Sequence, residues 1–361
     1  MCRELVQFCN LHERTGSYMP QTSRLAALLI ATSALMPFGA NASQIDDIKE
    51  FFSTADIVDG PSVVDCTLSG GTEGSCFSIT VKPSPKDYTP GPWCPTNIAD
   101  GADKGGIWFL DGQVQDVDGD FISRLAEIYG DTEWQLFDAE SGDIRYTGTL
   151  EACEAAARPD VDPEYQNYCV QCLPEYLPDD ASITYVIPMT PVMLDEPADT
   201  TRQGSGLAYN GIRLDGPAPL DAILAAHTVA PFDDCGGHVN PNVGYHYHAV
   251  TTCLGDAPAA TTDTADYGPQ IGIAMDGLPI MQHNDDVADK LDMCNGMMVE
   301  GVGYLYFAGA PGDNAILGCH VAEVGCTLEE ANGTCDASAP MRHGPPPGGG
   351  NGQPGAPRND G

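Results

Sequence analysis

Residues 244–250, GYHYHAV, alternate histidine with tyrosine, a pattern typical of a β-strand. Successive side chains of a strand point to opposite faces. The sequence therefore predicts that His246 and His248 lie on one face and that Tyr245 and Tyr247 lie on the other. One face should hold the strand to the rest of the fold, and the other should be available for chemistry.

Short apolar runs predict a β-rich first module over residues 43–178. The segment GGIWFLDGQVQDV places two strand-like runs around Asp111-Gly112, a dipeptide typical of a tight hairpin. EWQLFDAESGDIRYTG predicts a second hairpin in the same way. FISRLAEIYG, which ends at Gly130, and TLEACEAAARPD predict two short helices.

Pro-rich stretches separate this module from the rest of the chain. LPEYLPDD and VIPMTPVMLDEP lie around the boundary, and we expect a second domain over residues 179–338. Residues 339–361 are rich in Pro and Gly and have almost no apolar side chains to bury. They predict a disordered tail.

The second domain contains an internal repeat, with repeat one at about 207–255 and repeat two at about 269–320. GIRLDGPAP matches GIAMDGLPI, and FDDCGGHVNPNVGYHYHA matches LDMCNGMMVEGVGYLYFA without gaps at eight of 18 positions. The predicted fold is thus α+β and β-rich, with an internally duplicated C-terminal domain of two pseudo-symmetric halves stapled by disulfides.

The two copies differ at the histidines but not at the tyrosines. The positions of His238, His246 and His248 are taken in the second copy by Met297, Leu305 and Phe307. Tyrosines that persist while the histidines change should pack, with their hydroxyls reaching polar partners. The histidine face is apolar in the second copy, which indicates that it is buried or half-buried, so its imidazoles need hydrogen bonds or a ligand.

The first 42 residues predict an export signal. Arg24 precedes LAALLIATSALMPF, and Ala40 and Ala42 supply the small residues of a cleavage site, so we expect cleavage near Ala42. Met19 is the favoured start, because a signal of normal length begins there. The mature chain would be periplasmic or extracellular.

The cysteine count fits that location. Cys2 and Cys9 precede the cleavage site, and twelve of the 14 cysteines remain, an even number that predicts disulfides. We expect Cys169 and Cys172, a C-x-x-C, to be disulfide cysteines rather than zinc or redox residues. The expected pairs are Cys66 with Cys76 and Cys326 with Cys335 in short loops, and, by symmetry of the repeats, Cys235 with Cys253 and Cys294 with Cys319.

The charge excludes two classes of partner. The chain has 15 Lys+Arg and 52 Asp+Glu, a formal net charge of -37. Phosphate backbones and anionic membrane surfaces would be repelled, so we expect no nucleic-acid partner. No other apolar stretch is long enough to span a bilayer. The sequence does not indicate a substrate or a protein partner.

The histidine face predicts a metal site. His246 and His248, two residues apart on a strand, bring two imidazoles to one side, and His238 in a Gly-rich loop could supply a third. Three imidazoles suit zinc or copper. The alternative is a hydrogen-bonded His/Tyr cluster without metal. Four further residues could complete the set, namely Asp215, Asp234, Asp276 and His283.

An acidic stretch, DVDGDFISRLAE, offers a second, structural metal site. Asp116, Asp118, Asp120 and Glu127 occupy positions 1, 3, 5 and 12 of a calcium-binding loop. Position 6 is Phe121, where that loop needs glycine. The competing interpretation is an acidic turn that leads into a helix.

Residues of about 185–325 resemble the YHYH-domain proteins. The resemblance rests on YNGIRLDGP, DDCGGHVNPNVGYHYHAVTTCLG, PQIGIAMDGLPI, LDMCNG and YLYFAGAPGDNAILGC. It implies an exported or surface protein of a largely bacterial family, but no reaction. Members of that family often carry histidines in the second copy too, where this chain has Met297, Leu305 and Phe307.

Three functions remain open at this point. The first is an exported binding module for zinc or copper. The second is a metal-dependent extracellular hydrolase or lyase, with Asp276 or Asp234 as general base. The third is a structural or adhesive surface protein without metal. Against an enzyme, the sequence has no Gly-x-Ser-x-Gly, H-E-x-x-H or phosphate-loop motif.

Overall fold

The computed structural model describes residues 42–158, 160–200, 203–257, 264–328 and 333–339. Contacts divide the chain into residues 1–38 and 39–361, and every described residue belongs to the second unit. The predicted export signal lies outside the described residues, as does the predicted tail beyond residue 339. No helix in the described part is both long and apolar enough to cross a membrane.

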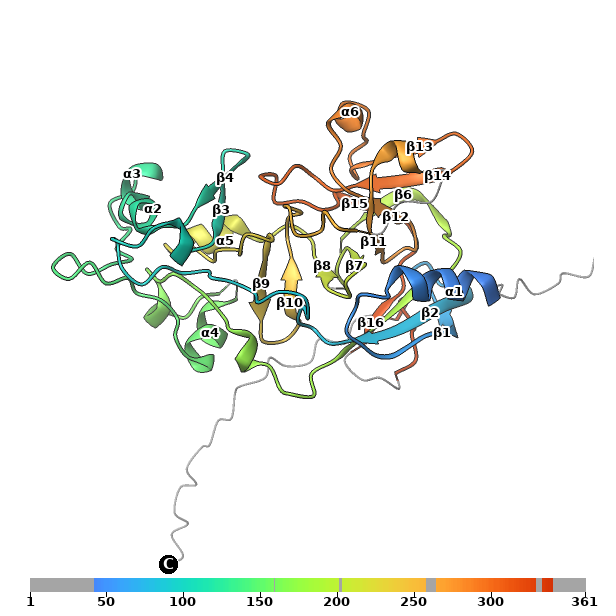
Figure 1. Ribbon diagram of the computed structural model, residues 1–361, viewed down its shortest axis with the longest axis horizontal. Coiled ribbons are helices and arrows are strands. Elements are labelled where there is room, and N and C mark those ends of the chain that lie inside the picture. Colours follow the sequence, from blue (N-terminus) through green and yellow to red (C-terminus); the bar gives the residue numbers. More distant parts are fainter. Residues whose placement is uncertain (1–41, 159, 201–202, 258–263, 329–332, 340–361) are drawn as a thin grey trace, which may run out of the picture. The chain divides into compact units, whose positions relative to one another are not determined.

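The described chain is β-rich with few and short helices. Its largest sheet has eight strands in the order β13-β14-β12-β11-β7-β8-β10-β9 (Figure 1). The strand bounds are β7 Gly206–Ala208, β8 Arg213–Leu214, β9 Gly237–Asn240, β10 Gly244–Tyr247, β11 Gln270–Ala274, β12 Pro279–Met281, β13 Gly296–Val299 and β14 Gly303–Phe307.

The two halves of this sheet pair in the same way. Strands β7 and β8 form an antiparallel hairpin, β8 runs parallel to β10, and β10 pairs antiparallel with β9. Strands β11, β12, β14 and β13 repeat these pairings in that order. The halves meet where β7 pairs antiparallel with β11.

The strand register corrects one alignment made from the sequence. Leu207 pairs with Arg213, and Ile273 pairs with Pro279. LAYNGIRL at 207–214 therefore corresponds to IAMDGLPI at 273–280, rather than GIRLDGPAP to GIAMDGLPI. The turn glycines of both hairpins have positive φ, which favours glycine and fixes this correspondence.

A four-stranded sheet joins distant parts of the chain in the order β1-β2-β5-β16. Its strands are β1 Ile57–Thr67, β2 Glu73–Val81, β5 Ile183–Pro188 and β16 Cys326–Leu328. A two-stranded sheet pairs β6, Met193–Asp199, with β15, Cys319–Ala322. Since β2 pairs with β5, hydrogen bonds cross the predicted boundary at residue 178, which stays a prediction.

The predicted hairpin around Asp111-Gly112 is confirmed as β3, Ile107–Leu110, and β4, Gln113–Asp116. Both turn residues have positive φ, as a tight hairpin turn requires. In the second predicted hairpin, only Phe137 bridges Ile144 within the segment. The helices are α1 Ala42–Phe51, α2 Gly119–Ser123, α3 Leu125–Ile128, α4 Leu150–Ala156, α5 Leu220–Ala225 and α6 Asp285–Ala288, with 3-10 turns at Ala102–Lys104, Pro163–Tyr165, Pro174–Tyr176 and Ala265–Tyr267.

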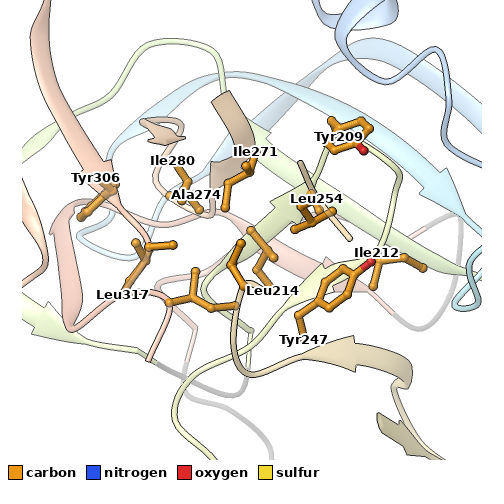
Figure 2. Packing of buried hydrophobic residues seen from close by; sticks show 14 of the residues in the cluster. Tyr209, Ile212, Leu214, Tyr247, Leu254, Ile271, Ala274, Ile280, Tyr306 and Leu317 are labelled. Carbon is orange, nitrogen blue, oxygen red and sulfur yellow. The ribbon is translucent and has the colours of Figure 1, made fainter. Parts of the chain in front are cut away.

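One apolar core contains the tyrosine faces of both halves. Tyr245, Tyr247, Tyr304 and Tyr306 belong to the same buried cluster, together with Leu214, Ile271, Ile280 and Leu317. Figure 2 shows Tyr247 and Tyr306 among these aliphatic side chains. The tyrosines therefore attach each hairpin to the sheet, and the opposite faces are left for other contacts.

Six disulfides join the described cysteines. Four join the pairs expected from the sequence: Cys66–Cys76, Cys235–Cys253, Cys294–Cys319 and Cys326–Cys335. The C-x-x-C is divided between two partners, since Cys94 binds Cys169 and Cys153 binds Cys172. These two bonds hold the segment around α4 in place.

Candidate metal centre

Three histidines converge on one face of the β9–β10 hairpin. His238 lies on β9 directly opposite His246 on β10, so the predicted loop position of His238 was wrong. Directly opposed residues of an antiparallel pair share a face. His248 follows β10 by one residue, and its backbone N–H bonds to the carbonyl of Gly236.

The histidine side chains are close-packed, with His246 and His248 buried and His238 half-buried. One nitrogen from each of His238, His246 and His248 lies within 4.8 Å of the other two. The ring centroids are 4.8 to 5.0 Å apart. His246 and His248 are only 4% and 6% exposed. Phe232 stacks on His238, so an aromatic ring covers one side of the cluster.

Backbone carbonyls fix the tautomers of the imidazoles. Nδ1 of His246 lies 3.0 Å from the carbonyl oxygen of Gly244, and Nδ1 of His248 lies 2.6 Å from that of Gly216. A carbonyl only accepts, so both Nδ1 atoms carry hydrogen and both Nε2 atoms keep a lone pair. His238 also hydrogen-bonds to backbone, at Ala230–Pro231. Such bonds orient metal-binding histidines in known sites.

Burial keeps the cluster neutral. It lowers the pKa of His238 well below the ordinary value, and the neighbouring imidazoles lower it further. Burial and His248 lower the pKa of His246 to about 3, against the opposing effect of Asp215. The pKa of His248 is lowered by burial as well. Unprotonated imidazoles can donate lone pairs to a metal at neutral pH.

Asp215 flanks the cluster without joining it. Its carboxylate accepts two bonds from the buried guanidinium of Arg213, at 3.0 and 3.1 Å. Burial opposes ionisation, but the pKa of Asp215 is nevertheless lowered, because the guanidinium of Arg213 stabilises the carboxylate. Asp215 is thus a charged neighbour whose charge Arg213 already balances.

A cavity of about 230 Å³ opens beside the histidines. Its polar wall contains His238, His246 and His248, and its other walls come from α4 and α5 and the segments that follow them. Those walls are largely apolar, formed by Ala156, Ala157, Val170, Pro219, Ile223 and Ala230. The lone pairs of the cluster therefore lie beside a space that a small molecule can fill.

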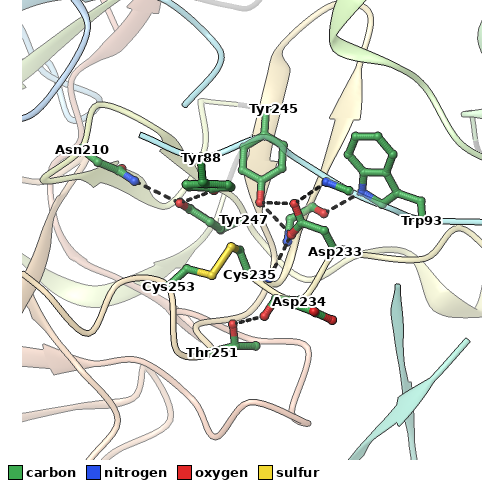
Figure 3. Close-up of a disulfide and its surroundings, with 12 residues drawn as sticks. Tyr88, Trp93, Asn210, Asp233, Asp234, Cys235, Tyr245, Tyr247, Thr251 and Cys253 are labelled. Atoms are coloured by element: carbon green, nitrogen blue, oxygen red, sulfur yellow. Dashed lines mark hydrogen bonds between the residues drawn. A yellow bond between two sulfur atoms is a disulfide. The ribbon is translucent and has the colours of Figure 1, made fainter. Parts of the chain in front are cut away.

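The tyrosine face of the hairpin is a closed polar network. Tyr245 donates to the Asp233 carboxylate, which also accepts N–H bonds from Gly91, Cys235 and Gly237. Figure 3 shows this carboxylate beside the Cys235–Cys253 disulfide, with the hydroxyls of Tyr247 and Tyr88 and the amide of Asn210 bonded to one another. This face is fully engaged in holding the hairpin.

The other half of the sheet repeats the tyrosine network but not the histidines. Tyr304 donates to Asp292, which accepts N–H bonds from Cys294 and Gly296, and Tyr306 donates to Asp276. The strand register places Met281, Met297, Leu305 and Phe307 where the first half has Asp215, His238, His246 and His248. These four side chains lie in one apolar cluster.

The remaining predicted ligands lie elsewhere. Asp276 is fully buried in the second half, where burial raises its pKa and Tyr306 donates to it at 2.6 Å. Asp234 is exposed and lines a different surface hollow, together with His283. His283 bonds to Asp285. None of these belongs to the converging group.

The acids of the predicted calcium loop do not converge either. In the described chain, the three histidines are the group that could hold a metal. Asp118 caps α2 by accepting from the Phe121 N–H, and Arg124 pairs with both Asp120 and Glu127. Asp116 ends β4. The geometry is that of an acidic turn leading into a helix.

The sequence did not identify some of the residues around the histidines. Phe232 covers His238, and Arg158 lines the cavity. Asp233 is one of the eight positions at which the two aligned segments are identical, and this identity is the sequence signal for its structural role. Nothing in the sequence near the histidines indicates Arg158, because α4 lies some 80 residues earlier in the chain.

Comparison with known families gives a match in the region that contains the three histidines. Residues 184–290 match the family model described as YHYH protein, which spans β7 to β12 and all three histidines. No curated protein and no solved structure matches the chain. The match and the YHYH motif at residues 245–248 show that residues 184–290 contain a YHYH domain.

Proposed function

We propose that this protein is an exported metal-binding protein that holds zinc or copper through His238, His246 and His248. One observation carries the proposal. Three imidazoles, two buried and one half-buried, each hydrogen-bond to the backbone, and one nitrogen from each lies within 4.8 Å of the other two. A cluster that served only for packing would not need three imidazoles brought together on one face.

The donor set favours zinc or copper. Neutral imidazoles suit both ions, whereas calcium and magnesium prefer oxygen. Tetrahedral zinc with bonds of about 2.0–2.1 Å separates its ligand nitrogens by about 3.4 Å. The nitrogens would close by at most about 1.4 Å from the 4.8 Å spacing, a shift that small side-chain rotations can supply.

The second half of the sheet supports a functional role for the polar cluster. We infer that the halves arose by duplication, because strand order, pairing and the Asp–Tyr network recur. Met281, Leu305 and Phe307 show that an apolar core satisfies this fold at the equivalent positions. Burying imidazoles at these positions costs free energy unless they have a ligand or a hydrogen-bond partner. The first half has therefore kept polar groups that packing alone does not require.

Export is the second part of the proposal. Six disulfides join all twelve cysteines that follow the predicted signal, as expected for a chain folded in an oxidising compartment. Cleavage near Ala42 would leave α1, Ala42–Phe51, at the start of the mature chain. N-terminal sequencing of the protein from the culture medium or periplasm tests this directly, and a start upstream of residue 40 would contradict it.

Cobalt substitution tests the site geometry. We expect the apoprotein to bind one equivalent of Co²⁺ with the intense visible absorption of a four- or five-coordinate ion, and zinc to displace it. The variant His246→Leu/His248→Phe should give no such spectrum. His227→Gln is the matched control, because His227 bonds to Asp131 away from the cluster. Retention of the spectrum in the double variant would contradict the proposal.

The second candidate function is a metal-dependent hydrolase or lyase. The 230 Å³ cavity favours it, because a purely structural metal site has a closed ligand shell. A metal bound by three histidines would keep a coordination position facing this cavity. Turnover of small esters that depends on added zinc and is lost in His246→Leu/His248→Phe would favour this candidate. Absence of metal binding would instead favour a structural or adhesive role.

A further inference from the structure

The cavity beside the histidines has properties that specify a ligand. Its volume of about 230 Å³ exceeds the cavity of about 150 Å³ that accommodates benzene in another protein. In proportion it holds about nine non-hydrogen atoms, the size of one aromatic ring with a short substituent. A polymer chain does not fit such a space, so the ligand is a small molecule or a single terminal group.

The electrostatics of the cavity differ from those of the whole protein. Acidic residues number 52 of 361, so fifteen residues drawn at random would include about two. The fifteen described residues that line the cavity include no Asp or Glu, and their one cation is Arg158. In a chain of formal charge -37, such a lining favours an anion over a cation.

Arg158, the cation of the cavity lining, lies near the cavity entrance. Its side chain is 48% exposed, and it contacts Asp160 in the same loop, so it lies where the cavity meets solvent. A divalent ion on three neutral histidines would carry two uncompensated positive charges, since Asp215 is already paired with Arg213. The metal would thus supply most of the attraction for a negative charge, and Arg158, which shares its charge with the exposed Asp160, would add a weaker contribution.

We infer that the cavity binds a small organic carboxylate with an apolar body, held between the histidine-bound metal and Arg158. The apolar body lies against the aliphatic wall that includes Val170 and Ile223. This inference deepens the proposed function and rests on it for the metal contact. Arg158 and the cavity walls supply the part that does not depend on the metal.

Calorimetric titration with three probes of one shape tests the inference. Benzoate is anionic, benzamide is neutral and benzylammonium is cationic, and all fit the volume. With one equivalent of zinc, we expect benzoate to bind at least tenfold more tightly than benzamide, and benzylammonium not to bind. Equal or weaker binding of benzoate would overturn the inference.

Two variants localise the effect. Arg158→Met should weaken benzoate binding by about threefold to tenfold, as expected for a half-exposed charged contact. Arg124→Met is the control, because Arg124 is similarly exposed and paired with acids outside the cavity. Ile223→Trp should fill the cavity and abolish benzoate binding while zinc stoichiometry stays unchanged. Benzoate affinity unaffected by both cavity variants would place the ligand elsewhere and overturn the inference.

Metal content, measured on the same samples, separates the two proposals. If zinc binds and benzoate shows no preference over benzamide, the inference fails and the proposed function stands. If zinc does not bind, the proposed function fails. The titration of the metal-free protein then decides whether an Arg158-dependent preference for the anion exists, and its absence overturns the inference too.

Discussion

The hairpins β9–β10 and β13–β14 share a backbone but differ on one face. Each has a Tyr-x-Tyr strand, a buried Asp–Tyr hydrogen bond and a disulfide at the Cys-x-Gly turn. On the opposite face, β9–β10 carries histidines and β13–β14 carries Met297, Leu305 and Phe307. The tyrosine face holds the fold in both halves, and the other face is where the halves diverge.

The difference shows which constraints come from folding. Phe307 and Leu305 are buried with Met281 in a cluster that needs no polar partner. His246 and His248 are also buried, but their rings hydrogen-bond to backbone carbonyls. They also lie near the Arg213–Asp215 ion pair and line the cavity. The first half thus bears a desolvation cost that the second half avoids, which is typical of functional sites.

The largest effect is expected when the histidines are transferred to the second half. Leu305→His/Phe307→His would create cavities and bury imidazoles among apolar side chains such as Val287 and Val299. We expect a loss of about 5 kcal/mol or more in the free energy of unfolding. Urea denaturation followed by circular dichroism measures it, and a loss below 1 kcal/mol would show that the faces are interchangeable.

The disulfides should contribute almost equally in the two halves. Cys235–Cys253 spans 18 residues and Cys294–Cys319 spans 25. Replacing both cysteines of either pair by alanine should cost about 3 kcal/mol, with a difference of about 0.3 kcal/mol in favour of the longer loop. Chemical denaturation of the two variants makes the comparison. A difference above 2 kcal/mol would mean that one disulfide does more than restrict the unfolded chain.

The two structural aspartates should differ in importance. Asp233 is 1% exposed and Asp292 is an exposed residue, although each binds a tyrosine and two turn N–H groups. Leaving buried groups unsatisfied costs about 1–3 kcal/mol, so Asp233→Ala should lose about 3 kcal/mol and Asp292→Ala about 1 kcal/mol. Thermal unfolding of both variants checks the order, and a reversed order would contradict the burial argument.

The histidine face of β9–β10 should make the stability of the protein depend on pH, whereas the apolar face of β13–β14 should not. The pKa of His246 is lowered from 6.5 to about 3 by burial. Between these values the unfolded chain binds a proton that the folded chain does not, so stability falls as the pH falls from 6.5. In metal-free buffer we expect a slope of about 1.4 kcal/mol per pH unit from His246 alone.

A variant that carries the β13–β14 side chains in place of the histidines should lose the dependence of stability on pH that the histidines cause. His238→Met/His246→Leu/His248→Phe should lose its share of the acid sensitivity between pH 6 and pH 4 in the same urea titrations. The remaining slope comes from carboxylates, which both proteins share. An unchanged slope would show that the histidines are accessible to protons in the folded state.

The sequence predicted which side chains of the β9–β10 hairpin share a face and which of them pack. Alternation placed Tyr245 and His246 on opposite faces, and comparison of the copies distinguished the packing residue from the polar one. The loop lengths and repeat symmetry indicated four disulfide pairs that the structure contains. These features follow from local pattern, which strand geometry makes readable.

The surroundings of the site could not be read from the sequence. The cavity wall with Arg158 follows α4, which the Cys153–Cys172 disulfide ties to the segment that contains Val170 and Gln171, and no local pattern in the sequence indicates this pair. The sequence alignment pairs Asp215 with Asp276, because each precedes a glycine, whereas the strand register makes Asn210 the counterpart of Asp276. The turn geometry at Asn210-Gly211, visible only in three dimensions, resolves this correspondence.

The most direct test of the account is the metal content of the protein purified without chelating resin, measured by mass spectrometry beside His246→Leu/His248→Phe. Those substitutions are the ones that β14 already carries. We expect near-stoichiometric zinc or copper in the parent and almost none in the folded variant. A parent that stays metal-free after incubation with each ion, and is as stable as the variant, would contradict it.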